Sequence, residues 1–341
     1  MTGSSPIDHA SLPVISVIVP TWNRRDFLRL TIESFHHQTL APGLFEVIIV
    51  DDASTDGTEA MVREMQAAAP FPLFYLRMAK NGGPVLARNR GAQTARSGIL
   101  AFTDSDCQAS PQWLAVAVAA FQADPELGFI TGPAVNTLGQ RTRFFSVGGT
   151  DYSGENPTYP AANAIYRKEV FWAVDGFDPS AFLHNAGSTP LDCSDVDLAW
   201  RVKEKGYRNR FLEDLVIYHA IRYLTPVDWL AHYTRFMTIP ELVRRHPGFG
   251  KAFLWRWRFC HPENPLFYLA VLGILSGAVV NRWLLLLALP FFSRMLYLLG
   301  RCISLPRLPL VLAQVCFLGM RQVVMCGSLL YGSIRSRTLV L

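Results

Sequence analysis

Acidic side chains stand at the ends of two apolar segments in the first third of the chain. Asp51 and Asp52 close the segment EVIIVDD (46–52), and Asp104 and Asp106 close the segment GILAFTDSD (98–106). Apolar segments of this length, rich in β-branched residues, are typical of strands buried on both faces. Ligands of parallel sheets bind at the carboxyl ends of the strands, so these carboxylates are candidates for substrate contacts.

The spacing of Asp104 and Asp106 predicts a metal site. The two residues are separated by Ser105 on a predicted turn, so both carboxylates can face one cleft. Unpaired carboxylates in one cleft repel each other, and a divalent cation removes that repulsion. Mg²⁺ and Mn²⁺ typically bind one or two carboxylates together with substrate phosphates. For Asp52 two interpretations remain, a hydrogen-bond acceptor for a nucleobase or ribose and a cap of the next helix.

A third acidic cluster lies in LDCSDVDLAWRVKEKGYR (191–208), where Asp195 and Asp197 precede a predicted helix. Carboxylates in the first turn are favoured by the helix dipole, which is one explanation for both. The same positive helix end also holds a carboxylate in place to act as a base. Asp195 is therefore a candidate general base.

Strand-length and helix-length segments alternate in the part of the chain that carries these residues. The predicted strands cover 14–20, 46–52, 73–78 and 98–106, and the predicted helices cover 26–37, 58–68, 85–95 and 111–123. This alternation predicts an α/β fold with a mostly parallel sheet flanked by helices. In the helix over 26–37 we expect Phe27, Leu30, Ile32 and Phe35 to be buried.

Taken together, the motifs resemble those of the family 2 glycosyltransferases. The similar segments are ISVIVPTWNR (15–24), VIIVDDASTDGT (47–58), KNGGPVLARNRG (80–91), LAFTDSDCQASPQWL (100–114), ANAIYRKEVFWAVDGFD (162–178), SDVDLAWRVKEKGYR (194–208) and VIYH (216–219). They follow in the family's order and spacing over about residues 14–245. The resemblance implies the family's A-type nucleotide-sugar-binding fold, which is Rossmann-like.

The resemblance also implies roles for individual residues. Those that it places at the donor nucleotide are Pro20, Thr21, Asn23, Asp52, Arg88 and Asp104. It makes Asp106 and His219 metal ligands and puts Asn163 in the pocket for the donor sugar or the acceptor. Asp195 matches the catalytic base, but Ser194 replaces the usual Glu of the Glu-Asp pair, so the resemblance does not define the neighbouring contact to the acceptor. A structural role for Arg88 and a buried core position for His219 are the alternatives.

The implied reaction is metal-dependent transfer of a single sugar, with inversion, from a nucleotide-diphosphate sugar to a hydroxyl of a glycan or lipid-linked acceptor. The implied cofactor is Mn²⁺ or Mg²⁺. One alternative is a processive polysaccharide synthase, whose Gln-x-x-Arg-Trp motif is replaced here by HYTRF (232–236). A second alternative is a non-catalytic membrane scaffold with a degenerate domain. Retention of Asp52, Asp104, Asp106 and Asp195 disfavours it.

The end of the chain has a different composition. Residues 1–200 carry 13 Lys and Arg against 21 Asp and Glu, whereas residues 201–341 carry 19 against 6, and no acid follows Glu263. Basic residues dispersed among apolar ones suit an anionic membrane surface and membrane lipids better than a nucleic acid, so we expect no nucleic-acid partner. Two apolar runs, 265–280 and 283–300, are near the length of membrane spans. A third run, 308–331, either spans or lies in the interface.

These observations predict four regions: a flexible tail over 1–13, a catalytic domain over 14–225, amphipathic linker helices over 226–264 and membrane-associated helices over 265–341. The six cysteines are scattered without a C-x-x-C pair, which fits a reducing compartment. The first residues lack the features of a signal peptide. We therefore expect the catalytic domain at the cytosolic face of the inner (plasma) membrane.

Overall fold

The computed structural model describes residues 12–137, 139–148, 154–179, 193–256, 258–302 and 308–341. The chain divides into two compact units. Among the described residues, unit 1 comprises those up to 141 together with 148–179 and 193–221, and unit 2 comprises 142–147 and those from 222 onward. Most of the tail predicted over 1–13 lies outside the described residues. The four predicted regions remain a prediction.

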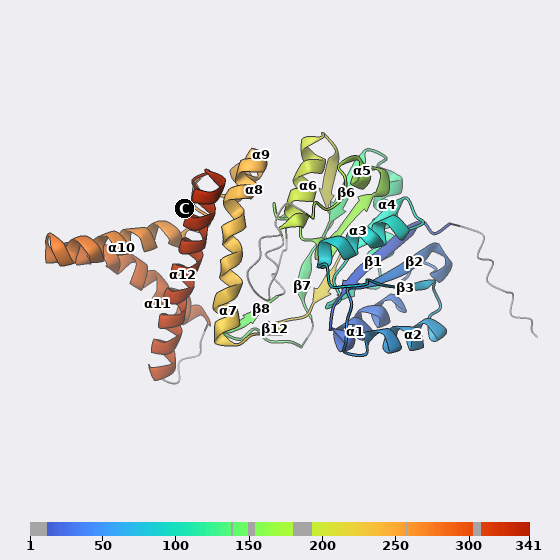
Figure 1. Ribbon diagram of the computed structural model, residues 1–341, viewed down its shortest axis with the longest axis horizontal. Helices are drawn as coiled ribbons and strands as arrows, with labels where there is room; N and C mark the ends of the chain where they lie inside the picture. Colours follow the sequence, from blue (N-terminus) through green and yellow to red (C-terminus); the bar gives the residue numbers. More distant parts are fainter. Residues whose placement is uncertain (1–11, 138, 149–153, 180–192, 257, 303–307) are drawn as a thin grey trace, which may run out of the picture. The chain divides into compact units, whose positions relative to one another are not determined.

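A seven-stranded sheet forms the centre of unit 1, with the strand order β10-β6-β9-β4-β1-β2-β3 (Figure 1). Its strands are β1 (Ile15–Thr21), β2 (Phe45–Asp51), β3 (Leu73–Arg77), β4 (Ile99–Phe102), β6 (Leu127–Thr131), β9 (Ala164–Arg167) and β10 (Arg208–Phe211). β9 runs antiparallel to both of its neighbours, and the other pairings are parallel. The mostly parallel sheet predicted from the sequence is therefore confirmed.

Helices cover both faces of this sheet. In unit 1 they are α1 (Arg25–Phe35), α2 (Thr58–Ala68), α3 (Pro84–Thr94), α4 (Trp113–Ala123), α5 (Lys168–Ala173) and α6 (Ser194–Glu204), with short 3-10 turns η1 (Pro42–Leu44) and η2 (Ala161–Asn163). The buried side chains of α1, α2 and α4 join those of Val17 and Val47 in one apolar core. α3 packs on the opposite face, where a Cβ on Gly91 would lie 2.5 Å from Ile18 Cγ2.

The buried face of α1 differs from the prediction. Ile32 and Phe35 are buried as expected, but Phe27 and Leu30 are 38% and 46% exposed. Leu28 is fully buried in their place. Residues 28, 32 and 35 follow helical spacing and share one face, whereas 27 and 30 lie off it. The prediction for Phe27 and Leu30 was wrong because it followed residue type and neglected the helical period.

A small three-stranded sheet lies beside the end of β4. It consists of β5 (Cys107–Ala109), β11 (Ile217–His219) and β7 (Ala134–Asn136), in the order β5-β11-β7. β11 is antiparallel to β5, so that His219 stands opposite Cys107. This pairing brings a residue from the end of unit 1 next to the turn that follows β4.

Unit 2 contains a two-stranded ribbon and a set of helices (Figure 1). Its elements are β8 (Ser146–Val147), β12 (Arg222–Tyr223), α7 (Pro226–His232), η3 (Tyr233–Thr238), α8 (Ile239–Arg245), α9 (Pro247–Phe253), α10 (Glu263–Val279), η4 (Arg282–Ala288), α11 (Leu289–Cys302) and α12 (Leu308–Ser336). Among the described residues one helix, over Ala313–Ser336, is long and apolar enough to cross a membrane. This segment overlaps the third apolar run, over 308–331, whereas the sequence favoured the first two.

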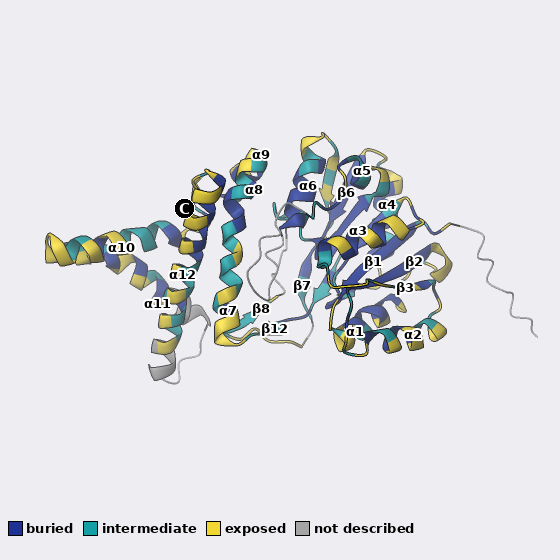
Figure 2. Ribbon diagram, in the orientation of Figure 1, coloured by how far each residue is buried: buried dark blue, intermediate teal, exposed yellow. Residues whose placement is uncertain are grey.

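The first two runs form a tight hairpin. α10 packs against η4 through two glycines four residues apart, since a Cβ on Gly273 would lie 2.7 Å from the Leu284 carbonyl oxygen and one on Gly277 would lie 2.8 Å from the Leu285 side chain. At the base of the hairpin, Arg294 donates to the buried Glu263 carboxylate over 2.8 and 2.9 Å. Exposed residues gather toward its tip (Figure 2).

Candidate active site

Asp106 lies on the turn between β4 and β5 and is 6% exposed. Arg24 donates from Nη1 to Asp106 Oδ2 over 2.5 Å. The other carboxylate oxygen, Oδ1, is buried and accepts no hydrogen bond from the described residues. It lies 3.6 Å from His219 Nε2. A buried carboxylate oxygen without a donor is costly, so this position favours a positively charged ligand.

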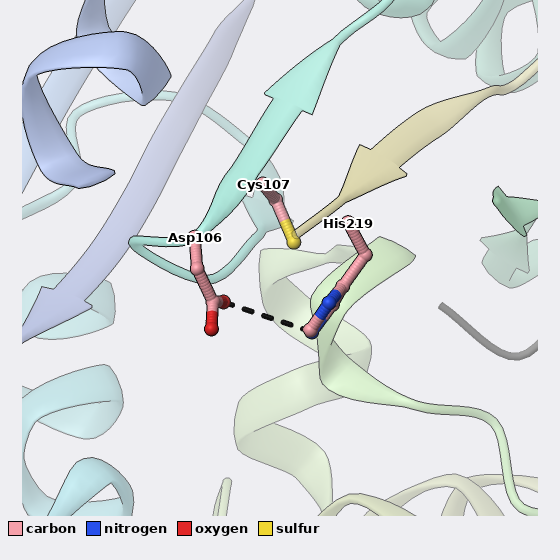
Figure 3. A group of neighbouring side chains, drawn as sticks. All are labelled: Asp106, Cys107 and His219. Atoms are coloured by element: carbon pink, nitrogen blue, oxygen red, sulfur yellow. Dashed lines mark ion pairs between the residues drawn. The ribbon is translucent and has the colours of Figure 1, made fainter. Parts of the chain in front are cut away.

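His219 is oriented by its own backbone. Its Nδ1 lies 2.9 Å from the carbonyl oxygen of Ala220, which can only accept, so the proton is on Nδ1. In the neutral imidazole Nε2 therefore carries a lone pair directed toward Asp106 (Figure 3). Two acceptors at this separation require a proton or a cation between them. A histidine that donates its other nitrogen to a backbone carbonyl is the usual arrangement of a metal ligand.

Cys107 completes the group of possible ligands, whose donor atoms lie within 4.8 Å of one another. Burial and the carboxylates of Asp104 and Asp106 raise the pKa of the Cys107 thiol well above its ordinary value. A neutral thiol is a poor ligand for Mg²⁺ or Mn²⁺, which prefer oxygen and accept imidazole. The carboxylate of Asp106 and the imidazole of His219 fit such an ion, and Cys107 is a neighbour without a required role.

Asp104 forms an ion pair with Arg88. Arg88 donates from Nη2 to Asp104 Oδ1 over 2.7 Å, and its guanidinium also lies over the ring of Phe177. Burial alone would raise the pKa of Asp104, but the charge and hydrogen bond of Arg88, together with the charge of Arg24, hold this pKa below its ordinary value. Asp104 therefore stays ionised beside Asp106, and Arg88, on α3, is tied to the turn after β4.

The loops that follow β1 and β2 are joined by hydrogen bonds. Asn23 has a left-handed backbone (φ 50°), its N–H donates to Ser54 Oγ over 2.8 Å, and its side-chain oxygen accepts from the Thr55 N–H over 2.7 Å. Pro20 and Thr21 are buried at the end of β1, opposite Val50 and Asp51 of β2. These hydrogen bonds join the loop after β1 to the loop after β2 at the end of the sheet.

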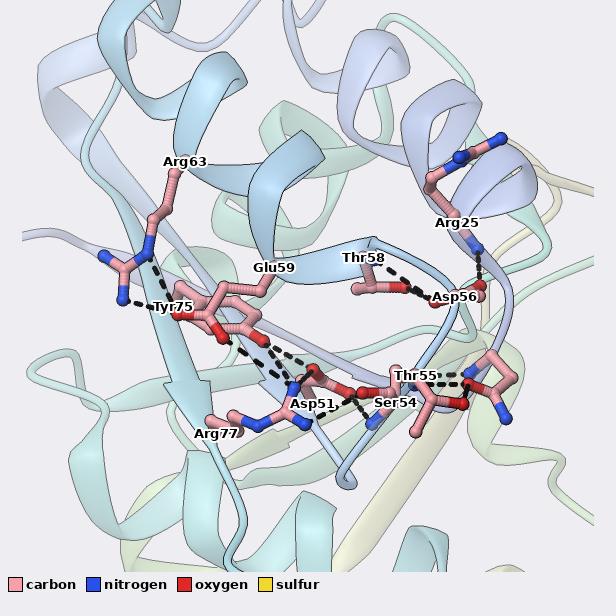
Figure 4. Close-up of polar contacts among 11 residues, drawn as sticks. Arg25, Asp51, Ser54, Thr55, Asp56, Thr58, Glu59, Arg63, Tyr75 and Arg77 are labelled. Carbon is pink, nitrogen blue, oxygen red and sulfur yellow. Dashed lines mark hydrogen bonds and ion pairs between the residues drawn. The ribbon is translucent and has the colours of Figure 1, made fainter.

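The adjacent acids Asp51 and Asp52 have different partners. Asp51 is fully buried and accepts from the Ser54 N–H, the Tyr75 hydroxyl and Arg77 Nη1, over 2.9, 2.5 and 2.9 Å (Figure 4). Asp52 is also buried and accepts from the N–H groups of Gly82 and Gly83, over 2.8 and 2.7 Å. Asp51 thus holds its own loop, and Asp52 connects the edge of the sheet to the start of α3.

Asn163 is fully buried within unit 1. Its side-chain oxygen accepts from Trp113 Nε1 over 2.9 Å, and its side-chain nitrogen donates to the carbonyl oxygens of Pro133 and Leu215 over 3.0 and 2.6 Å. These bonds join α4 to the segments that follow β6 and β10. The side chain has a structural role here, and its placement in the pocket remains a prediction.

Asp195 and Asp197 occupy the first turn of α6. Asp195 Oδ2 accepts from the Ala161 N–H over 3.2 Å, and its side chain is partly buried. Asp197 is 1% exposed and accepts from Arg201 Nε over 2.7 Å. Arg201 donates further to the carbonyl oxygens of Val174 and Gly176. Of the two acids, Asp197 is thus committed to an internal ion pair.

The sequence reasoning did not single out Arg24, which pairs with Asp106. A basic residue after PTWN is no motif by itself, and the contact joins positions 82 residues apart. The pairing of β11 with β5, which brings in His219, is similarly remote in sequence. A signal for His219 came from the resemblance, whereas Arg24 lies inside the similar segment ISVIVPTWNR (15–24) but was given no role by it.

Comparison with known proteins gives three findings. Residues 16–175 match the model of the family described as glycosyl transferase family 2. The chain is 27% identical over 219 residues to the glycosyltransferase AglE of Haloferax volcanii, covering 62% of this chain and 69% of AglE. It is 38% identical over 110 residues to validoxylamine A glucosyltransferase of Streptomyces hygroscopicus subsp. limoneus, covering 32% of this chain and 24% of that protein.

The fold is similar to that of a solved mannosyltransferase from Pyrobaculum calidifontis in complex with GDP-Man and Mn²⁺. The TM-score is 0.58 with 21% sequence identity, and the match covers 97% of this chain and 88% of the other. The family match ends at residue 175, so it includes Asp106 but not Asp195 or His219.

Proposed function

We propose that this chain, whose residues 16–175 match the family 2 glycosyltransferase model, transfers a single sugar, with inversion, from a nucleotide-diphosphate sugar to a hydroxyl of a glycan or lipid-linked acceptor. The proposed cofactor is Mn²⁺ or Mg²⁺, with Asp106 and His219 as its protein ligands. The observation that carries the proposal is the buried Asp106 Oδ1, which has no donor among the described residues and faces His219 Nε2 at 3.6 Å.

The proposed donor site lies along the ends of β1, β2 and β4. Pro20, Thr21 and Asn23 line the first loop, Asp52 is assigned to the base, and Asp104, paired with Arg88, is assigned to the ribose. When bound, the divalent ion neutralises charge that develops on the departing diphosphate. The mannosyltransferase of similar fold is described with GDP-Man and Mn²⁺, a nucleotide sugar and an ion of the proposed kinds.

Asp195 is the proposed general base. Its carboxylate would accept the proton of the acceptor hydroxyl as that oxygen attacks the anomeric carbon. The first turn of α6 supports an ionised carboxylate because the helix dipole is positive there. Asp197 is buried and paired with Arg201, and Asp195 is the position that matches the base in the resemblance. Asn163 is retained as a proposed pocket residue, with its hydrogen bonds to Trp113 and two carbonyls supporting the walls of that pocket.

The proposed location is the cytosolic face of the plasma membrane, where lipid-linked acceptors and membrane lipids are partners. Support comes from the acid-free segment after Glu263 and from the one helix, Ala313–Ser336, that is long and apolar enough to span among the described residues. Arg256 and Arg258 precede the hairpin and agree with a cytosolic flank.

The test is nucleotide-sugar binding and transfer by the purified full-length chain, with Mn²⁺ and with EDTA. A panel of uridine, guanosine, thymidine and adenosine diphosphate sugars should yield at least one donor that raises the melting temperature with Mn²⁺. Asp106→Ala should abolish the Mn²⁺-dependent part of binding and turnover. Glu64→Ala is the control, because its side chain is 71% exposed. Full Mn²⁺-dependent activity in the Asp106 variant would show the metal assignment to be wrong.

A further inference from the structure

Arg24 stands at a fixed place between β1 and α1. The preceding residue, Asn23, is held by Ser54 and Thr55, and the Arg24 carbonyl oxygen accepts from the Leu28 N–H over 2.9 Å in the first turn of α1. Hydrogen bonds therefore hold the backbone on both sides of the Arg24 Cα. The side chain starts from a rigid position at the same sheet edge as the proposed donor site.

The guanidinium of Arg24 contacts Asp106, one of the two proposed metal ligands, and is itself partly exposed. It donates to Asp106 Oδ2, so that the second oxygen, Oδ1, is directed toward His219. The Arg24 side chain is 33% exposed, whereas that of Asp106 is 3% exposed. Within the described part of the chain, this is the one hydrogen bond that the Arg24 side chain makes. A guanidinium has five N–H donors, and this bond uses one of them, so the exposed part of the group can still donate to a ligand.

We propose that Arg24 binds the diphosphate of the donor and, through its hydrogen bond to Oδ2, positions Asp106 for the metal ion. The inference rests on the proposed function and adds a residue to it. Arginine suits this role because its planar donors match phosphate oxygens in pairs.

The charges of the site support the same role. Asp104 already has Arg88 as its partner, so Arg24 is the second cation beside the two acids. A divalent ion at Asp106 Oδ1 would take over the neutralisation of that carboxylate. The positive charge of Arg24 then needs another anion, and the diphosphate supplies it on the partly exposed side of the guanidinium.

The experiment compares how tightly a nucleoside diphosphate and the matching monophosphate bind, measured by calorimetry in EDTA. UDP, GDP, TDP and ADP are paired with UMP, GMP, TMP and AMP, and the pair that binds the wild type best is used for the variants. Arg24→Gln should lower the preference for the diphosphate by about ten- to a hundredfold, the loss expected for a hydrogen bond to a charged group. Arg24→Lys, which keeps the charge but loses the paired donors, should recover part of it.

Arg25→Gln is the matched control, because it removes the same charge one residue away and its guanidinium pairs with the exposed Asp26. It should leave the preference unchanged. An unchanged preference in Arg24→Gln, or tighter diphosphate binding, would overturn the role of Arg24. Should the wild type bind none of the nucleotides with or without Mn²⁺, the proposed function itself fails, and the role of Arg24 fails with it.

Discussion

Two arginines neutralise the negative charges of the acids at the end of β4. Arg88 lies on α3 and binds Asp104, and Arg24 precedes α1 and binds Asp106. The pKa of Asp104 is lowered in spite of burial, so this carboxylate stays ionised. A lowered pKa stabilises the folded state above the ordinary pKa of an aspartate. This contribution is lost as pH falls through the lowered value.

At the residue scale, the base assignment predicts a separation of chemistry from binding. Asp195→Asn keeps the shape of the side chain but cannot take a proton, so turnover should fall about 10²–10⁴-fold while donor affinity stays nearly constant. Asp197→Asn should instead lower the melting temperature, because Asp197 is buried and paired with Arg201. Turnover per folded molecule should survive. Loss of turnover in the Asp197 variant, with activity kept in the Asp195 variant, would reverse the assignment.

At the scale of elements, the loop after β2 depends on Asp51 more than on any exposed charge near it. Asp51 receives three hydrogen bonds in a fully buried position, whereas Glu59 is 41% exposed and lies 3.8 Å from the same Arg77. The loop carries Ser54 and Thr55, which hold Asn23. Damage at Asp51 should therefore reach the nucleotide site.

The matching prediction compares Asp51→Asn with Glu59→Gln by urea unfolding. Asp51→Asn should cost about 1.5–3 kcal/mol of unfolding free energy, the range for hydrogen bonds to a charged group, and should weaken nucleotide binding. Glu59→Gln should cost less than about 1 kcal/mol, as for exposed ion pairs, and leave binding unchanged. Equal losses in the two variants would show that the Asp51 contacts do not stabilise the loop.

The elements were predictable from the sequence where the signal is local. The strands over 14–20 and 46–52 and the helix over 58–68 agree with β1, β2 and α2 within one residue at each end, because apolar runs and turn residues mark them. The antiparallel β9 was not predictable, since its place between β4 and β6 depends on long-range pairing. In the site, the sequence predicted the acids at the strand ends. It did not predict the contact between Arg24 and Asp106, because only the fold brings these two residues together.

At the scale of the whole chain, two apolar elements of unit 2 are candidates for the proposed membrane anchor. α12 packs with α7, η3 and α8, and Arg321 near its middle lies over the ring of Tyr233. Gln322 of α12 is fully buried and donates to Asn264 over 2.8 Å. The α10–η4 hairpin has fewer such partners and exposes 64% of Leu275 and 86% of Val279. We expect the hairpin to enter the bilayer and α12 to support it.

Vesicle flotation of the full-length chain tests this expectation, with liposomes of phosphatidylcholine and phosphatidylglycerol. The double variant Leu275→Glu/Val279→Glu should be released, because charges on the hairpin cannot enter the hydrocarbon without a large cost. Leu330→Glu/Ile334→Glu changes exposed residues of α12 in the same way and should stay bound. Release of the α12 variant alone would make α12 the anchor. A wild type that does not float, or that an alkaline carbonate wash releases, would show that the chain is not anchored.

Arg201 has a consequence for engineering. Its guanidinium binds Asp197 at the start of α6 and the carbonyl oxygens of Val174 and Gly176 just after α5. A single side chain thus joins the residues just after α5 to the start of α6. The entropic cost of closing a loop grows only slowly with its length, about 0.6 kcal/mol for each doubling. The number of residues between α5 and α6 can therefore change at a small cost in folding free energy while Arg201 keeps the two helices joined.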